Sequence, residues 1–266
     1  MKLTIIGGGN MGAAIVHGLV QGSIFKPNDI TVIDVMEEPL KALQNFNPAI
    51  RVALNDYESV EEADIILLAV KPWLIDNVIL AIKFKLDYSK QLIVSIAAGI
   101  TIAQMNEVLQ KPKEDVVLPV LFRAIPNTAI AIRQSVTLLS SENALPEQKA
   151  TLLKIFSELG HAVFLDESKL SAGTALTSCG IAYVFRYIRA ATLAGIEMGF
   201  YPKEAQNLVV KTLSGAAALL DETQANPEAE IDKVTTPGGI TIQGLNELEA
   251  NGFSNAVIKG IKASKK

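Results

Sequence analysis

The feature that most constrains this chain is a glycine-rich turn near its start. The run "KLTIIGGGNMG" places Gly7, Gly9 and Gly12 in the spacing G-x-G-x-x-G, after a β-rich segment and before a helical one. In such a turn the first glycine permits the bend, the second lets the backbone approach a pyrophosphate, and the third lets helix and strand pack closely. The spacing predicts a dinucleotide-binding turn that includes Asn10 and Met11. The alternative is a glycine turn that serves packing alone.

An acidic residue at the end of the second β-rich run supports the same interpretation. Asp34 lies 22 positions after Gly12, close to the roughly 20 expected for a carboxylate that binds the adenosine ribose. A 2′-phosphate would meet Asp34, Glu37 and Glu38, and the two positions after Asp34 carry no Arg or Lys. Charge repulsion therefore favours NADH over NADPH. Alternatively, Asp34 caps the helix that follows.

The first 165 residues alternate between strand-like and helical runs. The strand-like runs are "KLTIIG", "ITVID", "ADIILLAV", "QLIVSIAA", "VLPVLFRAIP", "SVTLLS" and "HAVFLD". The helical runs are "MGAAIVHGLVQG", "EEPLKALQNF", "PWLIDNVILAIK", "TIAQMNEVL" and "PEQKATLLKIFSELG". Nearly continuous apolar strands separated by helices are typical of a parallel sheet covered on both faces. We therefore expect a Rossmann-type, doubly wound, mostly parallel sheet over residues 1–165.

The character of the chain changes after about Asp166. Residues 168–199 and 202–220 are long helical runs, and only six of the 51 residues from 170 to 220 are charged. Too few residues follow the sheet domain to surround such apolar helices on all sides. We therefore expect an all-helical domain over residues 166–266 whose apolar faces are buried in a homodimer or a higher oligomer of dimers. The alternative is burial within its own domain.

The carboxyl ends of parallel strands should form the rest of a cofactor site, because ligands of open α/β sheets bind there. The motifs "AVKP" and "SIAAGI" follow two such strands, and their small alanines let the backbone approach the nicotinamide half of the cofactor. Asn127, which follows a later strand, either orients a substrate or closes a turn. The expected cofactor contacts here are Ala69, Val70, Lys71, Pro72 and Ala97.

Composition excludes several other kinds of site. One cysteine and two histidines argue against a disulfide framework, a metal centre and a Ser-His triad. A formal net charge of −4 provides no basic footprint for nucleic acid. The chain shows neither a basic, apolar leader nor a long uncharged apolar run. We therefore expect a cytoplasmic protein that binds neither nucleic acid nor membranes.

Six motifs together point to one family. The runs "IIGGGNMG", "ADIILLAVKP", "SIAAGI", "RAIPNT", "ALTSCGIAYVF" and "KVTTPGGITIQGL" follow one another as in pyrroline-5-carboxylate reductase, which the chain resembles over essentially its whole length. The resemblance implies reduction of 1-pyrroline-5-carboxylate to L-proline by NAD(P)H, the last step of proline biosynthesis. It also implies a Rossmann domain followed by a helical dimerisation domain. The chain departs from the family at "TSCGIAY", where S-G-S-G-P-A-Y is usual, and at Arg133 and Ser135, where glycines are common.

The resemblance also implies where the substrate binds. In the family, a T-P-G-G-x-T loop at the start of a helix holds the substrate carboxylate beneath the nicotinamide, and Glu167 falls on a position near the substrate. A helix start with a threonine hydroxyl is a physically suitable carboxylate site, and Thr241 is a candidate proton donor to the ring nitrogen. The loop residues that correspond are Thr236, Gly238, Gly239, Ile240 and Thr241.

Two other functions compete with this one. A related NAD-dependent hydroxyacid or imine reductase shares the architecture, but a hydroxyacid dehydrogenase typically needs a Lys or His on its helical domain, and "TALTSCGIAY" supplies neither. A non-catalytic dinucleotide-sensing protein would have no use for a second anion site. A protonated cyclic imine accepts hydride directly from the cofactor, so a chain poor in acid–base residues needs only to position and orient it.

Overall fold

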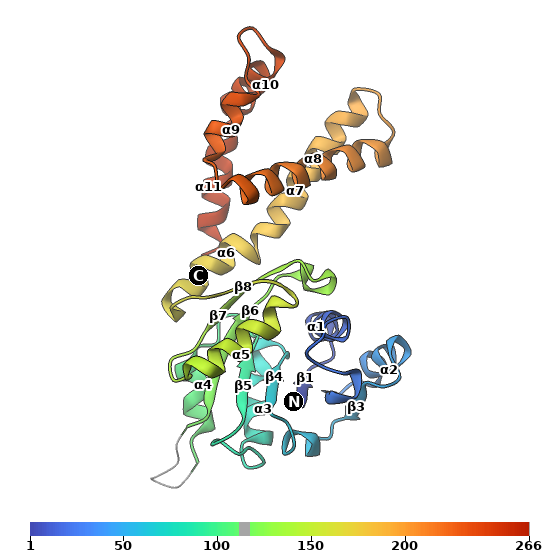
Figure 1. Cartoon of the computed structure of the whole chain (residues 1–266), viewed down its shortest axis with the longest axis vertical. Coiled ribbons are helices and arrows are strands. Elements are labelled where there is room, and N and C mark those ends of the chain that lie inside the picture. The colour runs from blue at the N-terminus through green and yellow to red at the C-terminus, as the bar shows by residue number, and fades with distance from the viewer. Residues whose placement is uncertain (112–117, 266) are drawn as a thin grey trace. The chain divides into compact units, whose positions relative to one another are not determined.

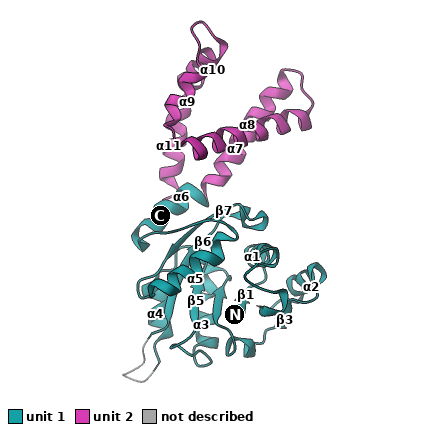
Figure 2. Ribbon diagram, viewed as in Figure 1, with its two compact units in different colours: residues 1–178 teal, residues 179–266 magenta. Residues whose placement is uncertain are grey.

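The computed structural model describes residues 1–111 and 118–265 of the chain (Figure 1). It divides into two compact units, an N-terminal unit, Met1–Ser178, and a C-terminal unit, Cys179–Lys266 (Figure 2). Helix α6 (Glu167–Thr177) packs against strand β7 (Ser135–Ser140) within the N-terminal unit. The predicted division after residue 165 thus falls just before α6, and the division into compact units falls just after it.

The N-terminal unit is built on one eight-stranded sheet of order β3-β2-β1-β4-β5-β6-β7-β8. Its remaining strands are β1 (Leu3–Ile6), β2 (Ile30–Asp34), β3 (Arg51–Leu54), β4 (Ile65–Leu68), β5 (Leu92–Ser95), β6 (Val120–Ile125) and β8 (Gly160–Phe164). Neighbouring strands are parallel except β6 and β7, which are antiparallel. The predicted doubly wound, mostly parallel sheet is confirmed. Its strand order reverses between β1 and β4, where such sheets bind their ligands.

Helices cover both faces of this sheet (Figure 1). Along β4, Ile65 and Leu67 belong to one core cluster with residues of α1 and α5, while Ile66 and Leu68 belong to a second with residues of α3 and α4. Because successive strand side chains point to opposite faces, both must be apolar, which explains the continuous apolar runs. The helices are α1 (Asn10–Val20), α2 (Glu37–Phe46), α3 (Ile75–Ile82), α4 (Ile102–Leu109) and α5 (Pro146–Ser157).

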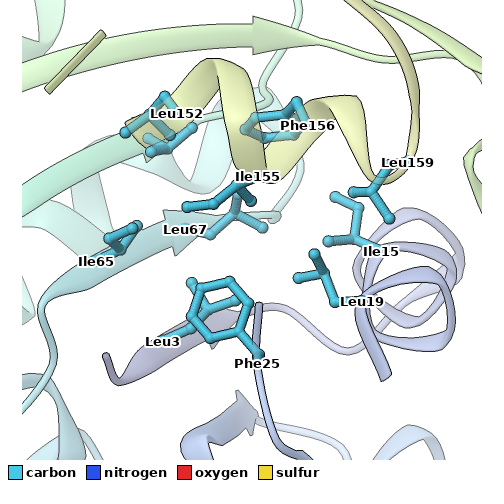
Figure 3. A pocket seen from close by; sticks show the side chains of 11 residues that line it. Leu3, Ile15, Leu19, Phe25, Ile65, Leu67, Leu152, Ile155, Phe156 and Leu159 are labelled. Atoms are coloured by element: carbon cyan, nitrogen blue, oxygen red, sulfur yellow. The ribbon is translucent and has the colours of Figure 1, made fainter. Parts of the chain in front are cut away.

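The first core cluster contains one small void, drawn in Figure 3. Its volume is about 10 Å³, and its lining includes Leu67, Phe25 and Phe156. A space of this size is at the lower limit for one water molecule and offers no polar partner. The void is therefore a packing feature of the core and not a ligand site.

Two local predictions need correction, and part of a third lies outside the described residues. The edge strand β3 was not predicted, because it is short and partly exposed and so lacks a continuous apolar signal. The helical run 168–199 is two helices, α6 and α7 (Gly180–Glu197). At the break, the Ser178 hydroxyl donates to the carbonyl of Pro126 at 3.0 Å. Of the predicted strand 117–126, residue 117 lies outside the described residues.

The C-terminal unit is helical throughout its regular structure. Besides α7 it contains α8 (Pro202–Thr223), α9 (Pro227–Lys233), α10 (Ile240–Ala250) and α11 (Phe253–Ala263). Helix α7 packs closely on α8, where a Cβ at Gly195 would lie 2.9 Å from the Cβ of Ala205. Ala205 is the one buried residue of the 22 in α8, and no residue of α9, α10 or α11 is buried. Helices this exposed need a further surface to cover them. In the part of the chain that the structure describes, no helix is long and apolar enough to cross a membrane.

Candidate functional site

The glycine turn joins β1 to α1 at the carboxyl end of the sheet. Gly7 has φ +110°, which favours glycine, and its N–H donates to the carbonyl of Ile33 at 2.8 Å. Gly9 is the N-cap of α1. The first turn of α1 therefore begins at the glycine loop, and its first backbone N–H groups have no partner within the helix.

The three glycines of the motif differ sharply in the space around them. A Cβ at Gly7 would lie 2.6 Å from the carbonyl oxygen of Ala69, and one at Gly12 would lie 1.9 Å from that of Gly7. A Cβ at Gly9 would meet no heavy atom within 4 Å. Gly7 and Gly12 are thus required by packing, whereas the open face of Gly9 fits a bound pyrophosphate.

Asp34 ends β2 beside this turn, and both of its carboxylate oxygens accept backbone hydrogen bonds. Oδ2 accepts from Gly8 N at 2.7 Å and Oδ1 from Met36 N at 2.9 Å. Met36, not Asp34, is the N-cap of α2, so the alternative that Asp34 caps this helix does not hold. Burial and then the Asp34 charge raise the pKa of Tyr57. Asp34 therefore holds the glycine turn and also places negative charge at the end of β2.

The ends of β4 and β5 lie next to the turn. Ala69 N donates to the carbonyl of Ile6 at 2.8 Å, which fixes the start of the "AVKP" segment against β1. Lys71 is exposed and is the N-cap of a short 3₁₀ helix, Pro72–Leu74. Ala97 is buried after β5. The order β1-β4-β5 thus brings these segments to one sheet edge with the glycine turn (Figure 1).

Asn127 closes a turn. Its side-chain oxygen accepts from Ala129 N at 3.0 Å and caps the 3₁₀ helix Thr128–Ile132, and its Nδ2 donates to the carbonyl of Thr177 at 3.5 Å. That 3₁₀ helix ends at Arg133, which has the left-handed φ of +59° that explains why glycine is common there. The Arg133 guanidinium contributes hydrogen bonds that glycine lacks, to the carbonyls of Glu158 and Gln21 at 2.7 and 3.2 Å.

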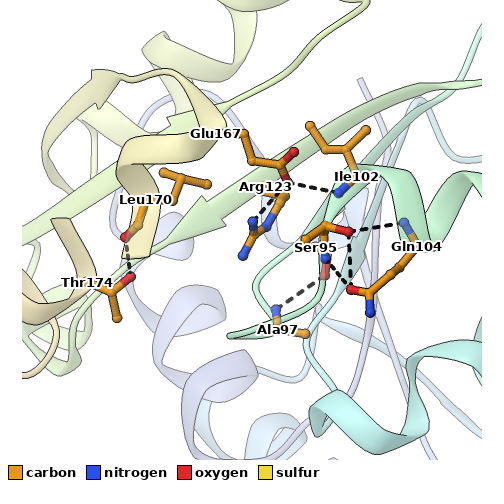
Figure 4. A network of polar contacts seen from close by, with 9 residues as sticks. Ser95, Ala97, Ile102, Gln104, Arg123, Glu167, Leu170 and Thr174 are labelled. Carbon is orange, nitrogen blue, oxygen red and sulfur yellow. Dashed lines mark hydrogen bonds and ion pairs between the residues drawn. The ribbon is translucent and has the colours of Figure 1, made fainter. Parts of the chain in front are cut away.

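Glu167, the first residue of α6, is turned toward the sheet (Figure 4). Its Oε1 accepts from Arg123 Nη1 and from Ile102 N, each at 2.9 Å. The ion pair is largely shielded from water, since the Arg123 and Glu167 side chains are 8% and 19% exposed. Glu167 is therefore held by partners from β6 and α4.

The second glycine loop lies in the C-terminal unit, between α9 and α10. Gly238 has φ +69°, and Gly239 N donates to the carbonyl of Thr236 at 2.9 Å, which closes a tight turn. Gly239 is the N-cap of α10, whose first residues are Ile240 and Thr241. Ile240 is 86% exposed and Thr241 is also exposed. The loop is thus a helix start with a threonine in its first turn, which is suited to bind an anion.

The chain matches known proteins along its length. Residues 167–266 match a family model described as pyrroline-5-carboxylate reductase dimerisation, and residues 2–99 match one described as NADP oxidoreductase, coenzyme F420-dependent. Pyrroline-5-carboxylate reductase from Methanosarcina acetivorans is 36% identical, over 99% of this chain and 97% of that protein. The chain belongs to the pyrroline-5-carboxylate reductase family. It is accordingly an oxidoreductase.

Two further relatives agree with this membership. Pyrroline-5-carboxylate reductase 1 of Dictyostelium discoideum is 36% identical, and the match covers 98% of this chain but only 48% of that longer protein. A crystal structure of Plasmodium falciparum pyrroline carboxylate reductase with NADP bound has a TM-score of 0.87 and 26% identity, covering 99% of this chain and 95% of that one. The two-part fold of this pyrroline-5-carboxylate reductase family member is therefore that of solved relatives.

Apart from Glu167, which is held by partners from β6 and α4, the predicted site residues of this family member fall into two groups. One group lies at the carboxyl ends of the strands in the N-terminal unit and consists of the turn Gly7–Gly12, Asp34, the segment 69–72 and Ala97. Residues 236–241 form a helix start in the C-terminal unit. Sequence reasoning missed Arg123, although an arginine inside the apolar run "VLPVLFRAIP" was a usable signal, since a buried charge needs a partner.

Proposed function

We propose that this chain reduces 1-pyrroline-5-carboxylate to L-proline, with a nicotinamide dinucleotide as hydride donor. Membership of the family over the whole chain supports this reaction. The observation that carries it is the presence of two glycine loops, each at a helix start, one in each unit. Two anion sites suit a reaction with a dinucleotide cofactor and a carboxylate substrate.

The residues present fit the cofactor. Gly9 leaves open space at the first turn of α1, where a pyrophosphate would accept hydrogen bonds from backbone N–H groups. Asp34 would accept hydrogen bonds from the adenosine ribose, and the segment 69–72 with Ala97 would border the nicotinamide half. When bound, the cofactor supplies the hydride that is added to the C=N carbon. The chain's own task is then to bind, orient and exclude water.

The loop that contains Thr236, Gly238, Gly239, Ile240 and Thr241 is proposed to hold the substrate carboxylate. Backbone N–H groups at the start of α10 donate to the carboxylate, and the helix dipole adds to the attraction. The exposed Thr241 hydroxyl is the proposed donor, or relay, of the proton to the ring nitrogen. Glu167 was placed near the substrate by family resemblance, and its observed contacts offer it a different role.

The proposed cofactor preference is for NADH. It rests on Asp34, whose carboxylate stands at the end of β2, and on Glu37 and Glu38, which open α2 as acidic residues. A 2′-phosphate would be repelled by this group of charges. The Plasmodium relative was solved with NADP bound, so the preference for this chain is argued from its own residues alone.

We also propose a homodimer, or an oligomer of dimers, as the working form in the cytoplasm. The C-terminal unit, with the α6 segment, corresponds to the dimerisation model. Its helices expose large apolar side chains such as Phe185, Met198 and Leu208, at 58%, 74% and 52%. A second copy of the same surface would cover them, as expected for an isologous interface. The proposed domain division after residue 165 assigns α6 to this dimerising part.

Initial rates with pyrroline-5-carboxylate and NADH or NADPH test the proposed reaction and the proposed preference for NADH. We expect turnover with both cofactors, a higher kcat/KM with NADH, and a shift of at least tenfold toward NADPH in Asp34→Ser, because that variant removes the charge beside the ribose. A matched control is Glu62→Ser. It removes a carboxylate near the amino ends of β1 and β4, where Glu62 pairs with Lys2 at 2.6 Å.

Two outcomes would contradict the proposals. A native preference for NADPH would refute the argument from Asp34. Turnover of a 2- or 3-hydroxy acid with NAD⁺, and none of pyrroline-5-carboxylate with either reduced cofactor, would replace the reductase activity with that of a hydroxyacid dehydrogenase.

A further inference from the structure

Glu167 contacts the helix that follows the loop 96–101, and this loop contains Ala97 of the proposed cofactor site. One of its bonds is to the N–H of Ile102, the first residue of α4, and the other is to Arg123 on β6. Helix α4 follows the loop 96–101, which begins after Ser95 at the end of β5. Ser95 and Arg123 are register partners in the sheet. Glu167 therefore binds the residue that follows the loop 96–101 (Figure 4), and its partner Arg123 pairs in the sheet with Ser95, the residue that precedes the loop.

Each end of this loop is held separately. At the strand end, Ala97 N donates to Ser95 Oγ at 3.3 Å. At the helix end, Thr101 and Gln104 form a capping box, in which Gln104 N donates to the Thr101 hydroxyl at 3.1 Å. Glu167 accepts a hydrogen bond from the N–H of Ile102, the residue after the N-cap Thr101. It thereby adds a long-range contact to the local capping box. Between these ends, Gly99 adopts a left-handed φ of +82°.

The ion pair between Arg123 and Glu167 is shielded from water, so other groups cannot easily replace the contact. Arg123 is a buried cation whose Nε has no hydrogen-bond partner in the described part of the chain, and Glu167 supplies the negative charge that balances it there. The Oε1 atom of Glu167 already serves a guanidinium and a backbone N–H. A carboxylate engaged in this way is suited to fix its neighbours in place.

We propose that Glu167 is a positioning residue that, with Arg123, fixes the loop 96–101 for the nicotinamide half of the cofactor, and that it does not bind the substrate. The inference rests on the proposed function, in which Ala97 borders the nicotinamide. It differs from the role that family resemblance assigns to Glu167. It also explains why an arginine interrupts the apolar strand β6.

Two substitutions at Glu167 test the proposal. Glu167→Gln keeps an oxygen that accepts both bonds, so we expect the Kd for NADH and kcat to stay within about threefold of native, with a lower Tm because Arg123 loses its counter-charge. Glu167→Ala removes both bonds, so we expect about tenfold weaker NADH binding and a kcat lower by about 10- to 100-fold. Asp166→Ala is the matched control, since that neighbouring carboxylate is 80% exposed.

NADH binding is measured by fluorescence titration without the imine, and kcat and KM by NADH oxidation with pyrroline-5-carboxylate. The proposal is overturned if Glu167→Gln raises the KM for the imine or lowers kcat tenfold while NADH binds normally, because Glu167 would then act on the substrate. It is also overturned if Glu167→Ala binds NADH as tightly as native protein. Should Glu167→Ala fail to fold, the Glu167→Gln result decides alone. If the native protein binds NADH but never oxidises it with the imine, the proposed function fails while the binding comparison still tests the loop.

Discussion

Replacing two glycines of the first turn by alanine should separate a packing role from a ligand-binding role. At Gly12 the new Cβ would lie 1.9 Å from the carbonyl oxygen of Gly7, about 1.5 Å closer than ordinary contact, which begins at 3.4 Å. The obstacle is backbone, so helix α1 must move. Overpacking of this kind costs about 3 kcal/mol, which at 2–4 °C per kcal/mol lowers the Tm by about 6–12 °C.

At Gly9 the same substitution meets no heavy atom within 4 Å, and φ −66°, ψ −170° is open to alanine. The weaker N-cap lowers the free energy of unfolding by up to about 1 kcal/mol. The smaller conformational freedom of the unfolded chain raises it by about 0.4–1 kcal/mol. We therefore expect a Tm within about 3 °C of native. The methyl group occupies the space proposed for the pyrophosphate, so NADH affinity should fall by about tenfold or more, equivalent to at least about 1.4 kcal/mol.

Calorimetric melting and NADH fluorescence titration of both variants provide the comparison. Gly9→Ala should lose affinity while keeping stability, and Gly12→Ala should lose both. The reasoning is refuted if Gly9→Ala binds NADH like native protein, or if it unfolds at as low a temperature as Gly12→Ala, because open space and backbone contact would then have the same consequence.

Two further predictions concern a proposed catalytic residue and a structural carboxylate. Thr241→Ala should lower kcat with pyrroline-5-carboxylate by at least tenfold, and a raised KM with an intact kcat would leave the hydroxyl a binding role only. Burial opposes ionisation of Glu158, but hydrogen bonds from the Ser23 hydroxyl and N–H and from Ile24 N, with the Arg133 charge, lower its pKa below 4.5. A lowered pKa stabilises the fold above the unfolded value and loses that contribution as pH falls through the folded one. The Tm difference between native and Glu158→Gln, measured from pH 7 to 3.5, should therefore be constant above about pH 5 and shrink below 4.5; a difference that stays constant down to pH 3.5 would contradict this.

The parts of the fold that local sequence determines were predictable. The strands β1, β2, β4 and β5 carry nearly continuous apolar runs because both faces of the sheet are covered, and the Gly7 turn carries the G-x-G-x-x-G spacing between a strand and a helix. The helix starts of α2 and α5 likewise agree with the predicted runs.

What escaped prediction depends on contacts between distant segments. The reversed direction of β7 and the break between α6 and α7 leave no periodic signal in the chain. The second bond of Asp34, to Gly8, spans 26 residues, and the bond of Glu167 to Ile102 spans 65. A sequence pattern identifies such residues as acidic and well placed, but only the folded chain shows which partner each one holds.

The nearly unburied helices of the C-terminal unit have a thermodynamic consequence. A 22-residue helix with one buried side chain gains little free energy from burial within its own chain, so in the proposed dimer the second copy supplies much of what keeps α8 folded. By mass action, a fold stabilised in this way is more resistant to heat at higher protein concentration. Folding and assembly of this unit are then one equilibrium, and the amount of protein in the cell becomes one of the quantities that sets its stability.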